Sequence, residues 1–182
     1  MFEIVKYPNP ILKKKCREFT TEELKSGKVG DMTFADIKAR LARAMAFDSG
    51  IGLAGPQIGL NLRVFMVNGT GNPDDDLIIF NPKLSNMKGE VVASEGCLSF
   101  PDVYIKVKRF AEVTLEGYDI MSKPFKLEAK DLLARVLQHE YDHLDGKLFI
   151  DYNMGAMDRV RTNKILNVLE ARWERSHKAK TK

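Results

Sequence analysis

The strongest constraint on the fold is a pair of histidines four residues apart, in the segment His139-Glu140-Tyr141-Asp142-His143. Apolar residues recur at helical spacing over about residues 129–145, and Gly146 stands where such a helix is expected to end. Positions i and i+4 share one face of a helix, so both imidazoles could bind one metal ion, and the glutamate between them could reach water at that metal. The alternative, two surface histidines, is disfavoured by the apolar stripe, because it predicts burial and buried histidines need partners. The stripe consists of Leu132, Leu133, Val136, Leu137 and Leu144.

A catalytic metal site usually takes three protein ligands and leaves one position open for water. Cys97 is the best candidate for the third ligand. It lies in Glu95-Gly-Cys-Leu-Ser99, just after the apolar Val91-Val92-Ala93, as expected at the end of a strand beside a tight turn. Gly96 lets the backbone approach a metal closely. On its own, Cys97 would more often be an inert buried thiol, but His177, in the polar tail, is a poorer candidate.

A third segment, Gly50-Ile-Gly-Leu-Ala-Gly-Pro-Gln-Ile-Gly59, contains four glycines and one polar side chain, that of Gln57. Glycine-rich loops can bind phosphate, but no Gly-Lys-Ser/Thr follows, so the sequence excludes a P-loop. We therefore expect a loop whose backbone comes close to a ligand, with one side-chain amide in reach of it.

The rest of the chain shows grouped rather than alternating helices and strands. Helical spacing marks residues 31–49 and about residues 156–176. Residues 111–118 alternate as in a half-buried antiparallel strand, and residues 147–152 are expected to be a short strand or extended stretch. This grouping predicts an α+β fold with a C-terminal helix. The apolar side of that helix is expected to contain Met157, Val160, Ile165, Val168, Leu169 and Trp173.

The length of 182 residues and the 44% of hydrophobic residues fit one globular domain over residues 1–182. Two cysteines indicate no disulfide framework and fit a reducing compartment. The first residues lack the apolar run of a signal peptide, and no stretch approaches the roughly 18 apolar residues of a membrane span. We therefore expect a cytoplasmic protein without a membrane partner.

Charge is distributed unevenly along the chain. Residues 159–182 contain eight basic and two acidic residues, a net charge of +6, whereas the whole chain carries +4. The first 158 residues therefore carry −2. A nearly neutral body with a basic tail favours a nucleic-acid or acidic-surface partner.

Together, the three segments resemble the peptide deformylase family. That family has a Gly-x-Gly-x-Ala-Ala-Pro-Gln segment, then Glu-Gly-Cys-Leu-Ser, then Gln-His-Glu-x-Asp-His-Leu-x-Gly. This chain has Gly50–Gln57, Glu95–Ser99 and Gln138–Gly146 in the same order. The second and third segments match at every fixed position, and the first has Gly55 where alanine is usual, which removes one methyl group and loosens the backbone. The resemblance covers most of the chain and implies antiparallel strands around the helix that carries the histidines.

The resemblance also implies a reaction and roles for the residues of the site. The enzyme would remove the formyl group from the amino-terminal methionine of nascent polypeptides and release formate. Glu140 would be the general base and acid, while Gln57 and the backbone N–H of Leu98 would stabilise the oxyanion. The metal would be Fe(II), with Zn, Ni or Co tolerated, although the ligand types alone favour Zn. Its ligands would be Cys97, His139 and His143.

Substrate contacts follow from the same resemblance. The backbone around Ile51 and Gly52 would pair with the peptide as an added strand. Many family members have an arginine where this chain has Tyr104, so contacts beyond methionine are expected to differ. An apolar pocket should hold the methionine side chain. Its candidates are Leu132, Val136 and Phe100, with core packing as the alternative.

Charged residues beside the motifs could orient the metal ligands through hydrogen bonds. Metal-bound imidazoles usually donate their other N–H to a carboxylate or carbonyl group. Asp142 could be such a partner, and Glu95 could pair with Arg109 near the site. For each of them, an ordinary solvated charge is the alternative.

The resemblance suggests one macromolecular partner. Bacterial relatives with a similar terminal helix dock it on the ribosome near the tunnel exit, so the basic helix over residues 156–176 could do the same. The alternative is that its apolar side packs on the body while its charges keep the surface hydrated.

Two other functions stay open from the residues alone. A His-Glu-x-x-His metallopeptidase would need a third ligand downstream, where only acids such as Asp145 or Asp151 occur. A non-catalytic metal-binding or peptide-binding module would leave Glu140 idle. Both would leave the glycine-rich and cysteine segments unexplained, so a deformylase is the favoured hypothesis.

Overall fold

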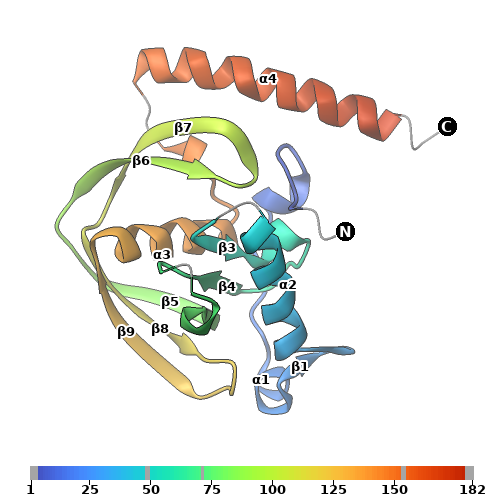
Figure 1. The fold of residues 1–182 in the computed structure, drawn as a ribbon, viewed down its shortest axis with the longest axis vertical. Coiled ribbons are helices and arrows are strands. Elements are labelled where there is room, and N and C mark those ends of the chain that lie inside the picture. The colour runs from blue at the N-terminus through green and yellow to red at the C-terminus, as the bar shows by residue number, and fades with distance from the viewer. Residues whose placement is uncertain (1–3, 48–49, 71, 153–154, 179–182) are drawn as a thin grey trace.

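The helix that carries the two histidines, α3 (Asp131–Leu144), lies in the middle of the molecule with strands on either side (Figure 1). Gly146 follows its C-terminal end with a φ of 69°, and a Cβ there would lie 2.5 Å from the Lys13 carbonyl oxygen. Only glycine fits such a position, so the predicted helix and its predicted stop are confirmed. The computed structural model describes residues 4–47, 50–70, 72–152 and 155–178.

Five antiparallel strands form the main sheet, in the order β3-β4-β5-β8-β9. One face packs on α3 through side chains such as Phe65 and Ile79. The strand predicted over residues 111–118 is confirmed as β8, which pairs with both neighbours. Thr114 is buried between Val113 and Leu115 and accepts a hydrogen bond from the Asn86 amide, so the strand is buried on both faces at this point. The strands are β3 (Gly52–Ala54), β4 (Val64–Val67), β5 (Leu77–Lys88), β8 (Glu112–Tyr118) and β9 (Pro124–Lys130).

The opposite face of the sheet packs on α2 (Phe34–Phe47), which confirms the predicted helix from residue 34 on, while predicted positions 48 and 49 lie outside the described residues. The Thr33 hydroxyl accepts a hydrogen bond from the Asp36 backbone N–H at 3.1 Å and so caps the helix start. β4 is buried along its whole length, because its even-numbered residues face α2 and its odd-numbered residues face α3. The core is therefore three-layered, with the sheet between two helices, and the α+β prediction is confirmed.

A separate antiparallel hairpin, β6 (Val91–Cys97) and β7 (Phe100–Arg109), covers the other side of α3 (Figure 1). Cys97 is the last residue of β6, as predicted, and the register shifts between it and Gly96. A Cβ on Gly96 would lie 2.6 Å from the ring of Tyr104, its partner on β7. Glycine therefore lets that ring lie directly against the strand that carries Cys97.

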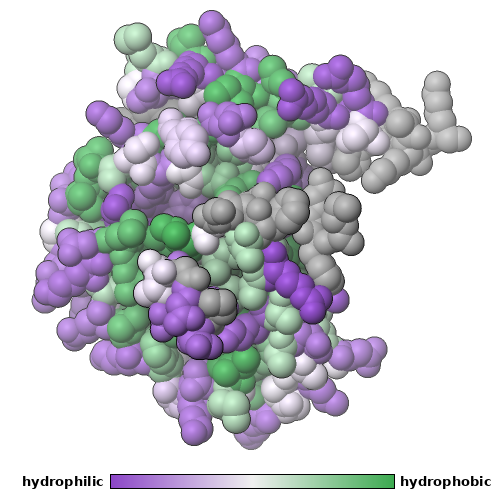
Figure 2. Space-filling view, in the orientation of Figure 1, coloured by the Kyte–Doolittle hydropathy of each residue, from purple (hydrophilic) through white to green (hydrophobic). Residues whose placement is uncertain are grey.

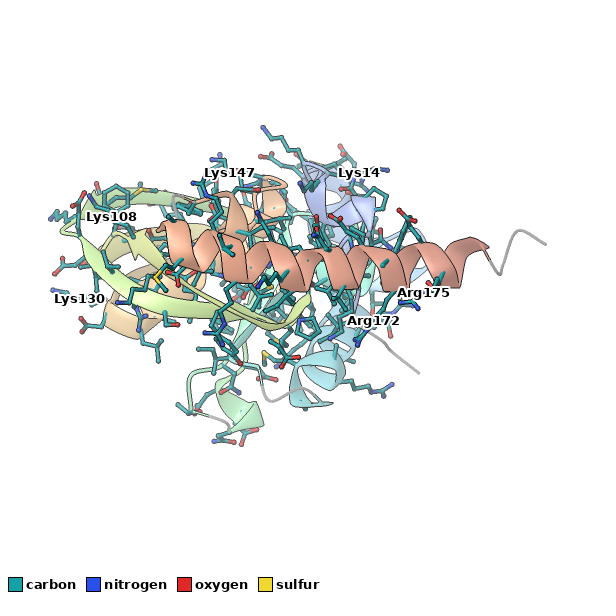
Figure 3. All side chains as sticks on the ribbon, turned by 90° about the horizontal axis from the view of Figure 1, so that it is seen from above. Lys14, Lys108, Lys130, Lys147, Arg172 and Arg175 are labelled. Carbon is teal, nitrogen blue, oxygen red and sulfur yellow. The ribbon has the colours of Figure 1, made fainter. Side chains whose placement is uncertain are left out.

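The terminal helix α4 (Ala156–Lys178) crosses the top of the molecule above β7 and extends past the body (Figures 1 and 3). Its predicted extent is confirmed, but its predicted apolar side is partly wrong. Met157, Val160 and Val168 are exposed, and hydrophobic side chains accordingly appear among hydrophilic ones along the upper edge in Figure 2. α4 rests on the body along a narrow line, so only a few of its apolar positions can be covered. Among its described residues, the covered or half-covered side chains are Asp158, Thr162, Ile165, Leu166, Leu169, Glu170 and Trp173.

The strand or extended stretch predicted over residues 147–152 is wrong. Here the chain forms a 3-10 turn, η4 (Phe149–Asp151), because the Asp151 carboxylate accepts the Leu148 backbone N–H at 2.8 Å. Within the described part of the chain, no helix is long and apolar enough to cross a bilayer. The remaining short elements are η1 (Pro10–Lys13), α1 (Thr21–Ser26), β1 (Lys28–Val29), β2 (Met32–Thr33), η2 (Gly55–Ile58) and η3 (Pro73–Asp75).

Candidate metal centre and cleft

Three ligand side chains from two elements meet at one point. His139 and His143 project from one face of α3, and Cys97 ends β6. The Cys97 Sγ lies 3.3 Å from the His143 Nε2, and the three ligand atoms lie within 4.8 Å of one another. Two ligands of one tetrahedral ion lie roughly 3.5 Å apart, given bond lengths of about 2.3 Å to sulfur and about 2.1 Å to nitrogen. The donor set therefore fits one small divalent metal ion, and the structure brings the three predicted ligands together as a metal site.

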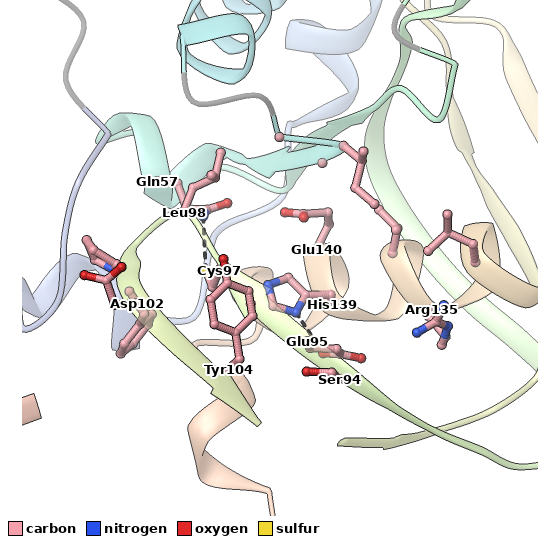
Figure 4. A pocket seen from close by; sticks show the side chains of 18 of the residues that line it. Gln57, Ser94, Glu95, Cys97, Leu98, Asp102, Tyr104, Arg135, His139 and Glu140 are labelled. Carbon is pink, nitrogen blue, oxygen red and sulfur yellow. Dashed lines mark hydrogen bonds and ion pairs between the residues drawn. The ribbon is translucent and has the colours of Figure 1, made fainter. Parts of the chain in front are cut away.

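Glu95 orients the first histidine. The His139 Nδ1 lies 3.0 Å from the Glu95 Oε2, so the Nδ1–H donates to the carboxylate and the Nε2 is left for the metal (Figure 4). Burial by itself would raise the pKa of Glu95, but hydrogen bonds from His139 and Arg109 outweigh it and hold the pKa at about 2. Glu95 is therefore a charged acceptor that fixes both the ring orientation and the tautomer of His139.

Arg109, at the end of β7, joins Glu95 to α3. Its Nε and Nη2 each lie 3.0 Å from a Glu95 carboxylate oxygen, and its Nη1 lies 2.5 Å from the Asp142 Oδ2. The Tyr152 hydroxyl also donates to Asp142, at 2.8 Å. The predicted Glu95–Arg109 pair is therefore present. Asp142 holds Arg109 and Tyr152 and is bonded to neither histidine.

Glu140 follows His139 on α3 and faces the cleft (Figure 4). Its side chain is buried, and among the described residues its Oε2 has no hydrogen-bond partner. Burial raises the pKa of Glu140 to about 7. Gly52 of β3 lies close over it, since a Cβ there would be 2.5 Å from the Glu140 Oε1. A buried carboxyl group with one unoccupied oxygen can hold a water molecule or exchange a proton with a bound molecule.

The Gln57 carboxamide is fixed beside Cys97. Its Nε2 donates to the Ser99 Oγ at 3.2 Å and lies 3.5 Å from the Cys97 Sγ, while its Oε1 accepts the Ala54 backbone N–H at 2.8 Å. The amide nitrogen therefore points toward the metal site. Leu98 follows the cysteine in the turn between β6 and β7 and lines the same cleft.

Gly55 has a packing role that the sequence did not indicate. A Cβ at this position would lie 2.7 Å from the Leu62 carbonyl oxygen and 3.0 Å from the Leu60 carbonyl oxygen. Glycine here allows a following loop to pack tightly on η2, which carries Gln57. The expectation of a merely loosened backbone is corrected.

A cleft of about 660 Å³ opens beside the metal site and includes every predicted substrate residue. Leu132 and Ile51 are 49% and 44% exposed at its edge. Phe100 is only 1% exposed, because its ring stacks on Tyr7 at 4.9 Å, so it is mainly a core residue that reaches the cleft. Tyr104, 72% exposed, stands across the mouth (Figure 4). The predicted substrate residues are Ile51, Gly52, Phe100, Leu132 and Val136.

Some residues of the site carried no local signal in the sequence. The Lys6 Nζ donates to the Leu98 carbonyl oxygen at 2.8 Å, and Asp102 lines the cleft. Ser99 lies inside a recognised motif, which could have indicated its contact with Gln57. Lys6 and Tyr152 reach the site only through the tertiary fold.

Comparisons with known proteins agree with this geometry. A family profile described as "Polypeptide deformylase" matches residues 1–159. A Vibrio cholerae protein named "Peptide deformylase 2" is 37% identical over 165 residues, covering 91% of this chain and 94% of that protein. An Arabidopsis thaliana protein named "Peptide deformylase 1B, chloroplastic/mitochondrial" is 34% identical over 176 residues, covering 94% of this chain and 61% of that protein. The crystal structure of a peptide deformylase from Legionella pneumophila matches with a TM-score of 0.80 and 32% identity, covering 96% of this chain and 98% of that chain.

Proposed function

Because the chain belongs to the peptide deformylase family and has the activity of a metal-dependent peptide deformylase, we propose that Glu140, Gln57 and Leu98 carry out the reaction beside the metal site. The substrates are formyl-methionyl polypeptides, and the products are formate and a peptide with a free amino group. A divalent metal held by the three ligands would polarise the formyl carbonyl and acidify a water molecule. Glu140 takes the proton of the attacking water and passes it to the leaving amine. The Gln57 amide and the Leu98 backbone N–H donate to the oxyanion that develops on the formyl oxygen.

The observation that carries this proposal is the buried Oε2 of Glu140, which has no hydrogen-bond partner within the described part of the chain and lies one residue from a metal ligand. Removing only its proton-carrying ability should spare the metal and stop the chemistry. Glu140→Gln should keep its metal content and lose kcat by about two to four orders of magnitude. The measurement is formate release from a formyl-methionyl peptide, with metal content determined on the same sample. Wild-type turnover in this variant would disprove the role of Glu140.

We propose that the peptide lies along β3 with its methionine side chain between Leu132, Val136 and the edge of Phe100. β3 is the first strand of the sheet order, so its outer edge can accept a further strand from a substrate around Ile51 and Gly52. Leu132 and Val136 line the cleft from α3, and Phe100 lines it from the hairpin. An apolar pocket of this kind suits the thioether chain of methionine.

We further propose that the physiological metal is Fe(II). This choice rests on the family, since a site with one thiolate and two imidazoles also suits zinc, nickel or cobalt. Metal analysis of anaerobically purified protein, with turnover measured after loading each metal, tests it. A protein that carries only zinc and turns over fastest with zinc would contradict the iron assignment.

The metallopeptidase alternative would need Asp145 or Asp151 as the third metal ligand, but both carboxylates have other partners. Asp145 lies 2.7 Å from the Arg63 Nη1, and Asp151 accepts the Leu148 N–H at 2.8 Å. Cys97 supplies the third ligand instead.

We propose that residues 1–182 form one catalytic domain that acts in the cytoplasm, with α4 as a contact to the ribosome. The charges of α4 support the contact, because basic side chains are exposed along the helix whereas the acidic Glu170 faces the body at Tyr7. Lys14 and Lys147 lie on one side of α4, and Arg172 and Arg175 lie toward its C-terminal end (Figure 3). The exposed basic residues of α4 are Arg159, Arg161, Lys164, Arg172 and Arg175.

Charge reversal separates the two roles of α4. Arg172→Glu with Arg175→Glu should weaken cosedimentation with ribosomes at low salt, because phosphate contacts depend steeply on salt. Turnover of a short formyl-methionyl peptide should stay at the wild-type level. No association of wild-type protein with ribosomes at low salt would contradict the proposed partner.

A further inference from the structure

The two groups proposed to hold the oxyanion come from separate parts of the chain, and a third part joins them. Gln57 lies on η2 and Leu98 lies in the turn after β6. Residues 5–7, here named the N-terminal clip, contact both. The Val5 backbone N–H donates to the Gln57 carbonyl oxygen at 2.8 Å, and the Tyr7 backbone N–H donates to the Ser99 carbonyl oxygen at 2.9 Å. Between them, the Lys6 Nζ donates to the Leu98 carbonyl oxygen at 2.8 Å.

Tyr7 connects this clip to the terminal helix. Its ring stacks on Phe100, two residues after Leu98, with centroids 4.9 Å apart and planes 29° apart. Its hydroxyl donates to the Glu170 Oε1 of α4 at 2.5 Å. Burial and the neighbouring Glu170 carboxylate raise the pKa of Tyr7 to about 12, so the hydroxyl stays a hydrogen-bond donor. A continuous set of contacts therefore runs from α4 through Tyr7 to Ser99, whose hydroxyl accepts from the Gln57 amide at 3.2 Å.

These contacts matter because oxyanion donors act only at the correct distance from the reacting atom. A displacement of about 1 Å can lower a rate roughly a hundredfold. The hydrogen bonds of the clip fix the backbone carbonyl groups of Gln57 and Leu98, the two residues that supply the donors, and of Ser99, which follows Leu98. We propose that Tyr7 is a positioning residue for the oxyanion donors, and that Glu170 of α4 holds it in place. This inference rests on the proposed roles of Gln57 and Leu98.

The test removes single links and keeps the rest of the holoenzyme. Tyr7→Phe keeps the stack on Phe100 and loses the hydroxyl, and Glu170→Ala removes its acceptor. Each should lower kcat roughly tenfold, with KM within about twofold and metal content unchanged, because the donors are displaced while the metal ligands are not. Glu170→Gln, which still accepts the hydroxyl proton, should retain most of kcat. Asn167→Ala, an exposed position on the same helix, is the matched control and should have wild-type kcat.

Two further measurements make the result specific. The double variant Tyr7→Phe/Glu170→Ala should lose no more kcat than either single variant, because both remove one link. Hydrogen exchange of the Tyr7 amide should accelerate in Glu170→Ala and stay slow in Asn167→Ala. Wild-type kcat and wild-type exchange in Tyr7→Phe and Glu170→Ala would overturn the proposal, as would additive losses in the double variant. Absence of formate release by the wild-type protein would overturn the proposed function instead, and the exchange comparison would still decide whether Glu170 holds the clip.

Discussion

The two long helices on either side of the β6–β7 hairpin, α3 and α4, differ in how the rest of the molecule contacts them. α3 is enclosed by the main sheet and the hairpin, and seven of its fourteen residues are buried. α4 is longer, with 23 residues, yet among its described side chains only Thr162 is fully buried. The sequence predicted both helices, and the predicted apolar face agrees better with the structure for α3. Of that stripe, Leu137 and Leu144 are buried, Leu133 and Val136 are half-buried, and Leu132 at the cleft is exposed.

This difference shows under which conditions the hydropathy pattern of a helix determines which of its faces packs on the body. An enclosed helix covers most of its apolar stripe, so the stripe and the motif on it fix the rotation of the helix, although Leu132 at the cleft stays 49% exposed. A helix resting on a narrow line can leave apolar residues in water, and a few contacts fix its rotation instead. For α4, these contacts are Ile165 and Leu166 on the hairpin core and the Tyr7–Glu170 hydrogen bond. Changes around α3 should therefore have large effects, and most changes on α4 should have small ones.

The largest expected effect is the loss of a metal ligand beside α3. Cys97→Ala should bind much less metal, because only two ligands remain. Its kcat/KM should fall at least roughly a thousandfold, because the reaction needs the metal. Cys16→Ala is the matched control, since Cys16 is buried in the sheet core and is not part of the ligand cluster. Metal content and formate release are the measurements. Full metal content with full turnover in Cys97→Ala would contradict the ligand assignment.

The next effect concerns stability. Arg109→Leu leaves the carboxylates of Glu95 and Asp142 buried without their cationic partner, so it should lower the free energy of unfolding by about 3–5 kcal/mol. Lys108→Ala removes the adjacent but exposed ion pair with Glu90 and should change it by less than about 1 kcal/mol. Denaturant unfolding of the two variants gives the comparison. Equal changes in the free energy of unfolding would show that the buried ion pairs around α3 contribute no more to stability than the exposed pair.

A single methyl group should also disturb the α3 side of the cleft. Gly52→Ala places a Cβ 2.5 Å from the Glu140 Oε1 and 2.9 Å from Val136, so Glu140 must move. We expect kcat to fall roughly a hundredfold with little loss of metal, because the carboxylate is displaced while the ligands are not. Gly69→Ala, where a Cβ meets no atom within 4 Å, is the control. Unchanged kcat in Gly52→Ala would show that Glu140 has room that the structure does not indicate.

The smallest effects are expected on α4, and they separate its two faces. Leu166→Ala should lower the free energy of unfolding by about 1–2 kcal/mol, because the side chain packs partly on the hairpin core. Val160→Ala should change it by less than about 0.5 kcal/mol, because Val160 is 59% exposed. Thermal unfolding of the two variants distinguishes them. A larger effect of Val160→Ala than of Leu166→Ala would indicate that the apolar side predicted from hydropathy is the one that packs on the body.

The sequence by itself determined the metal ligands, the residue beside them and the α+β class. The reason is local for the histidines, because His139 and His143 lie on one helical face by geometry. Cys97 is a candidate from its place after an apolar run, and the resemblance of its motif to the peptide deformylase family implies that it is a ligand. Residues whose role depends on one turn of helix or one tight loop can be found this way. The glycine-rich segment likewise predicted a loop close to a ligand, and its Gln57 and Gly52 both line the cleft.

The tertiary structure alone decided which distant residues complete the site. Arg109 meets Asp142, and Tyr7 meets Glu170, across 33 and 163 positions of the chain, and no periodicity encodes such pairs. It also decided that Gly55 packs under Leu62 and that Val160 stays in water. Hydropathy says which side chains prefer burial, but the packing of the other elements determines how much surface there is to cover them.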